Sequence, residues 1–320
     1  MNQETVVQIL NEVCTSQSIK KFTQSKNTFI AYKKGWNSFT NWCYEHGLDP
    51  FATTPQDIVK FLITKACITN KDGDKPLSLN TVRLYRSAIN DKYREAEKSS
   101  PAAHVLVNGV LRGLAKSIGD IPRRVKAIKE SQLIAMLKSC SSSLYGTRDA
   151  AVLAVGFAAA LRRSEMSSLQ IQDLEFKGSE GVVLLVRQSK TDLRGIGQRI
   201  AIPKGRRIRP IHYLQKWLSC SAIESGFVFQ TLKKGGRPTG NPLDPGDVAR
   251  VVKRYVKIIG LDPRDYSGHS LRSGFVTAAA THHARIEKIM EVTRHRNFDT
   301  LMKYIRNEEM FIGHAGSKFL

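Results

Sequence analysis

The chain has 320 residues, 41% of them apolar, and its 50 Lys and Arg against 28 Asp and Glu give a formal net charge of +22. This length allows two domains with separate cores, and the charge favours nucleic acid as partner, with a ribosome-associated or merely basic protein as the alternative. The five cysteines have no C-x-x-C spacing, which argues against a disulfide framework and a zinc finger. Because no stretch approaches the ~18 apolar residues of a membrane span and residues 1–11 do not resemble a signal peptide, we expect a cytoplasmic, DNA-associated protein without membrane contact.

The first third of the chain has the pattern of a helical domain. Apolar side chains between Phe29 and Cys43 recur at three- and four-residue steps, which places them on one helical face. The segment 54–57, Thr-Pro-Gln-Asp, predicts a helix start with a threonine cap and an early proline. A polar loop at 70–76 precedes a helix from Ser78 to about Tyr93, and a further helix is expected at about 102–116. The apolar residues expected on the 78–93 helix are Val82, Tyr85, Ala88, Ile89 and Tyr93.

The pattern breaks at 117–129, where Gly119, Pro122 and several basic residues predict a linker. This divides the chain into an N-terminal domain of about 1–119 and a second domain of about 120–320. In the second domain we expect helices near 130–140 and 145–162. A strand is expected at 181–186 with its partner at 199–202, and after Pro210 the pattern again predicts helices to the end of the chain.

Four separated segments carry side chains suited to work on a phosphate. The segment 160–166, at the expected end of an apolar helix, has the sequence ALRRSEM, and 187–191, in the β connection, has RQSKT. The segment 267–274 has the sequence SGHSLRSG. In the last segment, His295 stands nine residues before Tyr304.

Together these segments resemble the tyrosine recombinase (phage integrase) family, in particular its Cre-like members. The family pattern is L-R-x-S-E, a lysine in a β-hairpin, G-H-x-x-R, and a His or Trp nine residues before a Tyr. The motifs span about 156–306, and Ser78, Thr81 and Val82 are similar to the family's core-binding, SAM-like domain. The resemblance implies a mainly α fold with a small antiparallel β-sheet. It also implies that the N-terminal helical bundle and the catalytic domain form a C-shaped DNA clamp.

The resemblance also implies how a DNA phosphodiester would be cleaved without a metal. Tyr304 would be the nucleophile and form a covalent 3′-phosphotyrosine intermediate. Arg162 and Arg272 would each hold non-bridging phosphate oxygens through two hydrogen bonds. Arg163 is an alternative to Arg162 on the residues alone, but the family places its arginine directly after the leucine.

Four further side chains would assist this chemistry. His269 matches the histidine that helps the tyrosine lose its proton, and Lys190 matches the lysine that protonates the departing 5′ oxygen. Arg187 and Arg194 lie near Lys190 in the sequence. His295 would hydrogen-bond a phosphate oxygen, and Glu165 would orient the basic side chains.

Other basic residues are candidates for contacts with duplex DNA. The candidates for base contacts on the 78–93 helix are Arg83, Arg86 and Lys92. The candidates for contacts with the DNA backbone are Lys204, Arg206, Arg207 and Arg209. No cofactor is expected, and no metal site, because the sequence has no matching ligands for the His282-His283 pair.

We therefore expect a site-specific DNA recombinase that acts as a homo-tetramer on two duplexes, on target sites with inverted repeats. The apolar residues of the tail 307–320 would join neighbouring protomers. Two alternatives remain on the sequence. One is a relaxing enzyme of the type IB topoisomerase kind, and the other is a DNA-binding relative without catalysis.

Overall fold

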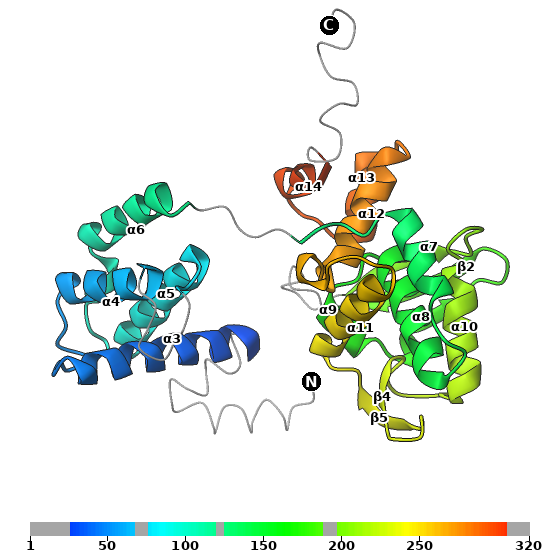
Figure 1. Ribbon diagram of the computed structural model, residues 1–320, viewed down its shortest axis with the longest axis horizontal. Coiled ribbons are helices and arrows are strands. Elements are labelled where there is room, and N and C mark those ends of the chain that lie inside the picture. Colours follow the sequence, from blue (N-terminus) through cyan, green and yellow to red (C-terminus); the bar gives the residue numbers. More distant parts are fainter. Residues whose placement is uncertain (1–25, 68–75, 120–124, 188–196, 306–320) are drawn as a thin grey trace, which may run out of the picture. The chain divides into compact units, whose positions relative to one another are not determined.

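The computed structural model describes residues 26–67, 76–119, 125–187 and 197–305 (Figure 1). The chain divides into two compact units, Met1–Arg123 and Arg124–Leu320. The first is helical, and the second combines helices with two small antiparallel sheets. The expected fold class, mainly α with a small antiparallel sheet, is confirmed. No helix in the described part of the chain is long and apolar enough to cross a membrane.

The first unit is a bundle around an aromatic core. Its helices are α3 (Lys26–Glu45), α4 (Pro55–Cys67), α5 (Leu79–Glu95) and α6 (Val105–Ser117), with a short 3₁₀ turn at Pro101–Ala103. The rings of Phe39 and Phe61 meet edge to face at 5.1 Å between centroids, and both side chains are fully buried. Gly35 lets α3 pack closely on α5, because a Cβ there would lie 2.9 Å from Cδ1 of Tyr85.

Local capping explains where these helices begin. The backbone N–H of Thr54 donates to the Asp57 carboxylate at 2.9 Å, as expected for the start of α4. The Ser78 side chain accepts from the backbone N–H of Thr81 and caps α5. All five apolar residues predicted on α5 are buried. The helix expected at 102–116 begins three residues later, because the 3₁₀ turn precedes it and His104 caps α6.

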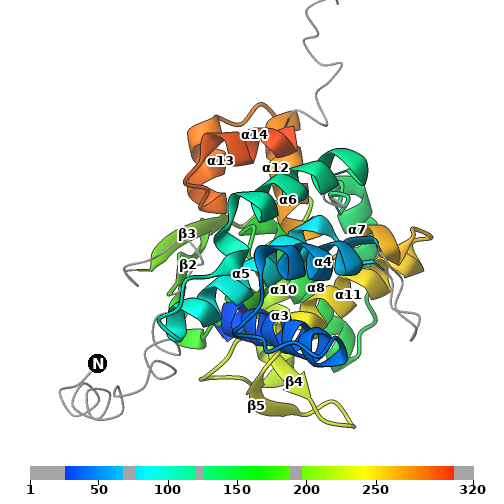
Figure 2. The same ribbon diagram turned by 90° about the vertical axis from the view of Figure 1, so that its left-hand side faces the viewer.

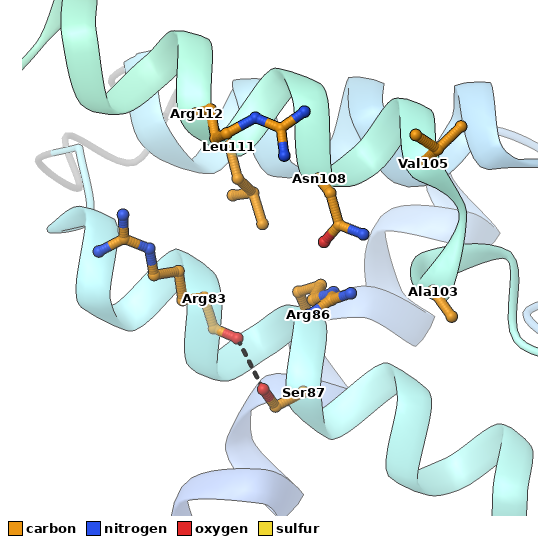
Figure 3. Close-up of a pocket in the computed structure, with 8 residues that line it drawn as sticks. All are labelled: Arg83, Arg86, Ser87, Ala103, Val105, Asn108, Leu111 and Arg112. Carbon is orange, nitrogen blue, oxygen red and sulfur yellow. Dashed lines mark hydrogen bonds between the residues drawn. The ribbon is translucent and has the colours of Figure 1, made fainter.

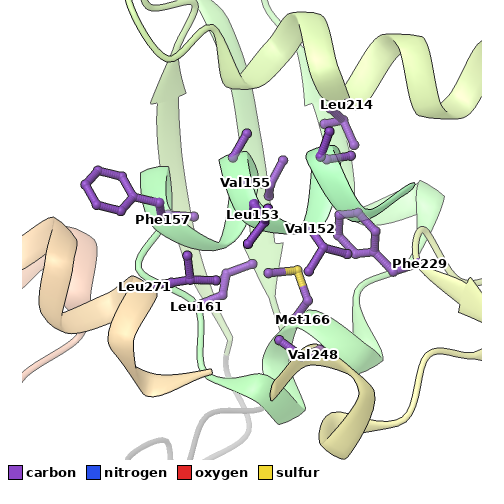
Figure 4. Close-up of a cluster of buried hydrophobic side chains, with 14 of the residues drawn as sticks. Val152, Leu153, Val155, Phe157, Leu161, Met166, Leu214, Phe229, Val248 and Leu271 are labelled. Carbon is purple, nitrogen blue, oxygen red and sulfur yellow. The ribbon is translucent and has the colours of Figure 1, made fainter. Parts of the chain in front are cut away.

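The second unit is built around α8 (Leu144–Ala158), which is buried without interruption from Gly146 to Phe157. Helices α7 (Glu130–Lys138), α10 (Pro210–Ser221), α11 (Pro245–Ile258) and α12 (His269–Thr281) pack against it. Figure 4 shows Val152, Leu153 and Val155 of α8 among the apolar side chains of these neighbours. Helices α13 (Ile286–Thr293) and α14 (Phe298–Ile305) lie beside α12 (Figures 1 and 2).

The larger sheet has three antiparallel strands in the order β1 (Leu174–Phe176), β2 (Gly181–Val186) and β3 (Gln198–Pro203). The predicted pairing of 181–186 with 199–202 is confirmed, with Val186 opposite Gln198. A second pair, β4 (Gln230–Leu232) and β5 (Pro238–Pro242), forms a small hairpin (Figure 2). The prediction of helices alone after Pro210 is therefore wrong.

Two features hid this hairpin in the sequence. The strand β5 has the sequence PTGNP, which is typical of a turn. Side chains add to its backbone pairing, because Oε1 of Gln230 accepts from the backbone N–H of Gly240 at 2.7 Å and the hydroxyls of Thr231 and Thr239 meet at 2.5 Å. Contacts of this kind have no periodic signal in the sequence.

The helix expected at 145–162 ends four residues earlier, at Ala158. Ala160 has a left-handed backbone, with φ of 47°. The N–H of Ala160 bonds to the carbonyl of Phe157, and the N–H of Leu161 bonds to that of Gly156. These two bonds form a Schellman motif, which usually has glycine where Ala160 stands. The chain then turns into α9 (Arg163–Ser168), so Arg162 lies in an extended segment and not on the helix.

The predicted linker extends to Lys129, but the structure places residues 125–129 within the second unit. The N–H of Lys126 donates to the carbonyl of Asp265, and that of Ile128 to the carbonyl of Ser270. The Ile128 side chain is fully buried in the core of this unit. Gly274 on α12 makes room for this segment, because a Cβ there would lie only 2.3 Å from the carbonyl oxygen of Ile128.

Candidate active site

Three parts of the second unit meet at one place: the turn between α8 and α9, the first turn of α12, and the end of α13. Arg272 joins them through its guanidinium group. Nη1 donates to the carbonyl of Ala160 at 2.8 Å, and Nη2 donates to the carbonyl of Thr293 and lies 3.4 Å from Nε2 of His295. The residue is only 2% exposed. Because a buried guanidinium needs hydrogen-bond acceptors, these backbone oxygens fix the place of Arg272.

Arg162 lies at the start of α9 and is held by Glu165. The backbone N–H of Arg162 donates to Oε2 of Glu165 at 2.7 Å, and Nη1 donates to Oε1 at 2.6 Å. The Glu165 side chain is 1% exposed and that of Arg162 is 21% exposed. Arg163 is exposed, and its aliphatic stem lies against Gly268. The geometry therefore gives the two neighbouring arginines different surroundings.

Two histidines lie in this cationic environment. Desolvation, together with the charges of Arg272 and Arg162, lowers the pKa of His269. The same causes lower the pKa of His295 to about 4. Both imidazoles are therefore mainly neutral at pH 7, and each keeps one ring nitrogen with a lone pair.

The hydrogen bonds of His295 also define its tautomer. The Thr293 hydroxyl donates to the carbonyl of Ile289 at 2.6 Å, which uses its single proton. The same oxygen lies 2.8 Å from Nδ1 of His295, so it accepts from Nδ1–H. The lone pair of Nε2 then lies on the side of the Arg272 guanidinium.

Arg294 is a site residue that the sequence did not indicate. Its Nη2 donates to Oε2 of Glu165 at 2.7 Å and to the carbonyl of Ala160 at 3.0 Å. Its Nη1 donates to the carbonyls of Ala159 and Val292. Since an arginine in a basic chain is usually exposed, nothing in its sequence context predicts that this one is 3% exposed.

The charges at this site do not balance. Burial opposes ionisation of Glu165, but the charge of Arg294 and the hydrogen bonds from Arg162 outweigh it and lower its pKa. Within the described part of the site, one carboxylate, that of Glu165, thus accompanies three guanidinium groups: it pairs with Arg162 and Arg294, while Arg272 lies beside His295. The resulting positive field favours an anionic ligand such as a phosphate.

Comparison with known proteins identifies the protein family of this chain. Residues 126–310, more than half of the chain, match the phage integrase family. The chain belongs to the phage integrase family. It is therefore a tyrosine recombinase, an enzyme that breaks and rejoins DNA.

Individual relatives are similar in sequence to nearly the whole chain. The "Integrase/recombinase xerD homolog" of Selenomonas ruminantium is 31% identical over 313 residues, which are 95% of this chain and 89% of that protein. "Recombinase cre" of Escherichia phage P1 is 21% identical, over 88% of this chain and 84% of the phage protein. The names of these relatives favour a recombinase over the topoisomerase alternative.

Solved structures show that the fold is shared. The XerH site-specific recombinase, bound to a palindromic difH substrate, matches with a TM-score of 0.68 at 17% identity, covering 99% of this chain and 89% of that one. A lambda integrase tetramer bound to a Holliday junction matches with a TM-score of 0.54 at 20% identity, covering 88% and 72%.

The catalytic roles of all six predicted residues remain predictions, and the side chains of two of them are not described. Lys190 lies outside the described residues. Tyr304 lies on α14, of which the backbone is described at this position. Leu301, three residues earlier, is fully buried and packs with Val276 and Ala280 of α12. Helix α14 is therefore held against the helix that carries His269 and Arg272.

The basic residues predicted to contact DNA lie in both units. A groove of about 500 Å³ in the first unit is lined by Arg83, Arg86, Asn108 and Arg112, among others (Figure 3). Arg86 donates from Nε to the carbonyl of Ala102 at 2.9 Å, and Lys92 pairs with Glu95 at 2.7 Å. The predicted backbone-contact residues in the second unit are all exposed: Lys204, Arg206, Arg207 and Arg209.

Glu130 on α7 contacts two basic side chains of the second unit. The side chain of Arg207 forms an ion pair with Glu130 at 3.0 Å. His282 lies 3.2 Å from the same glutamate, on an exposed part of the surface. Among the described residues, no group of three or more His, Cys, Asp or Glu could hold a metal ion.

Proposed function

We propose that this recombinase cleaves and rejoins specific duplex sites through a 3′-phosphotyrosine at Tyr304. What supports this is the meeting of Arg162, His269, Arg272 and His295 in one cationic site, beside the helix that carries Tyr304. A transferring phosphoryl group gains negative charge in the transition state. Fixed guanidinium groups that face it lower the barrier because their placement needs no reorganisation.

The proposed steps follow from the protonation states. The hydroxyl oxygen of Tyr304 attacks phosphorus and forms a new P–O bond, while the bond to the 5′ oxygen breaks. Neutral His269 accepts the tyrosine proton, and its lowered pKa keeps it unprotonated before the attack. Lys190 gives a proton to the 5′ oxygen as it leaves. The reverse sequence rejoins the strand, because the phosphotyrosine bond preserves the energy of the original ester.

We also propose that the two units share the work on DNA. The first, about 1–119, binds the target through the arginine-lined groove, and the second, about 120–320, holds the scissile phosphate. Phosphate contacts supply most of the affinity and make it salt-dependent. The palindromic substrate of XerH and the lambda integrase tetramer on a Holliday junction favour a tetramer on two duplexes with inverted repeats. Such a protein acts wherever its DNA lies, which we expect to be the cytoplasm.

Covalent capture tests this proposal even though the target sequence is unspecified. The purified chain is incubated with a library of nicked duplexes that carry a randomised segment and with the DNA that flanks its gene. Denaturing gels then reveal any protein–DNA adduct, and sequencing identifies the site. Tyr304→Phe should abolish the adduct and leave site binding nearly unchanged, because only one oxygen is removed.

Each result has a clear meaning. An adduct from the Phe variant at wild-type yield would remove Tyr304 from the role of nucleophile. Specific DNA binding by the wild-type chain, with no adduct on the selected nicked site, would indicate a DNA-binding relative without catalysis.

A further inference from the structure

Arg294 occupies a costly place in the fold. Its backbone is left-handed, with φ of 57°, a conformation that L side chains adopt only against steric resistance. Its guanidinium group is buried, and within the described residues its Nε has no hydrogen-bond partner. Glycine at this position would avoid both the backbone strain and the buried charge. Because the backbone here would favour glycine, the arginine side chain must have a role of its own.

The contacts of Arg294 show where this contribution lies. Its side chain runs from the end of α13 to the turn after α8, where it bonds to the carbonyls of Ala159 and Ala160. It then reaches Oε2 of Glu165, the carboxylate that also bonds to Arg162. Arg294, which directly precedes His295, thus connects the end of α13 to the segment that carries Arg162.

The shared carboxylate determines the charge that Arg162 can offer to a phosphate. Glu165 and Arg294 are each only 1% exposed at the side chain, so water screens their interaction poorly. With Arg294 present, the negative charge of Glu165 is divided between two guanidinium groups. Without it, the whole carboxylate charge would act on Arg162 and oppose its attraction for the phosphate.

We propose that Arg294 is a positioning residue for strand cleavage, because it balances the charge of Glu165 and thereby leaves Arg162 effectively cationic. This inference rests on the proposed function and concerns a residue that does not itself need to touch the DNA. It predicts that the rate of cleavage depends on the charge of the Glu165–Arg294 pair and not on the arginine alone.

Single-turnover cleavage of a nicked duplex obtained by covalent capture tests this, at saturating protein so that affinity does not limit the rate. Arg294→Met should slow adduct formation by about 10–100-fold, less than the ~10²–10³-fold cost of removing a group that itself contacts the transition state. Half-site binding should change little, because many phosphate contacts share the affinity. Arg294→Lys keeps the charge and should be faster than the Met variant. Arg285→Met is the matched control, because this exposed arginine pairs only with exposed Glu287 in the described contacts, and it should cleave at the wild-type rate.

The double variant Glu165→Gln/Arg294→Met separates charge balance from a merely structural role. It replaces the ion pair by neutral groups and restores the charge on Arg162, so it should cleave faster than Arg294→Met alone. A double variant as slow as Arg294→Met or slower would overturn the proposal, as would an Arg294→Met variant with the wild-type rate.

Folding and the proposed function are controlled separately. If Arg294→Met does not fold, the double variant Glu165→Gln/Arg294→Met provides the test, since replacing both buried charges is tolerated better than removing one. Cleavage by the folded neutral pair at close to the wild-type rate then supports the proposal, and loss of its cleavage overturns it. Failure of the wild-type chain to form an adduct would count against the proposed function, whereas a defect confined to the variants concerns Arg294.

Discussion

Gly274 is the position where one added methyl group tests the packing of the catalytic helix. It lies on α12, two residues after Arg272, and is buried against the carbonyl oxygen of Ile128. An alanine Cβ would stand 2.3 Å from that oxygen and 3.0 Å from Cε2 of Phe157. Carbon–oxygen contacts are normally about 3.3 Å or longer, so the backbone at Ile128 would have to move by about 1 Å.

The size of the effect follows from two opposing contributions. Overpacking a tight site costs about 3 kcal/mol at the upper end of the usual range, and here the obstacle is backbone that cannot rotate away. Alanine recovers about 1 kcal/mol because it favours helix over glycine. The net loss of about 2 kcal/mol corresponds to a fall of about 4–8 °C in the Tm of a unit of this size.

Differential scanning calorimetry measures this directly, with Gly113→Ala as the matched control. Gly113 lies inside α6, and a Cβ there would meet nothing within 4 Å. The same substitution should therefore raise the stability of the first unit by about 0.5–1 kcal/mol. An unchanged or higher Tm for the second unit in Gly274→Ala would refute the packing described for α12 and residues 125–129.

Three further predictions concern the chemistry and the assembly. Lys190→Ala should slow cleavage by about 10²–10⁴-fold but recover most of its rate on a substrate with a 5′-bridging sulfur, which needs no proton to leave; equal defects on both would remove Lys190 from this role. His295 should titrate near pH 4 by NMR. Because this pKa lies below the ordinary value of about 6.5, the contribution of His295 to stability is complete above pH ~6.5 and is lost as the pH falls toward 4. Titration near 6.5 would contradict the environment described. Deletion of residues 308–320 should spare half-site binding but weaken cooperative filling of full sites in gel-shift titrations, and undiminished cooperativity would show that the tail does not act between protomers.

The sequence predicted the part of the site that depends on motifs. Arg162, His269, Arg272 and His295 were named from short patterns, and the structure brings them together from segments more than 100 residues apart. The caps of α4 and α5 were also predictable, because capping depends on residues within one turn of each other.

What the sequence did not predict depends on tertiary contacts. The turn at Ala160 has a left-handed backbone without the glycine that would indicate it. The burial of Arg294 depends on partners far away in the chain, namely the Glu165 carboxylate and the carbonyls of Ala159 and Ala160. The 125–129 segment has the composition of a linker, but the gap at Gly274 and the backbone bonds to Asp265 and Ser270 make it part of the second unit.

This last segment determines where the second unit can be separated from the first. A fragment that begins at Glu130 would lack the buried Ile128 side chain and the backbone bonds to Asp265 and Ser270. It would leave an open slot beside Gly274 and would expose apolar surface that favours aggregation. A fragment that begins at Arg124 keeps these contacts, so an autonomous catalytic fragment has to include residues whose composition alone suggests that they are dispensable.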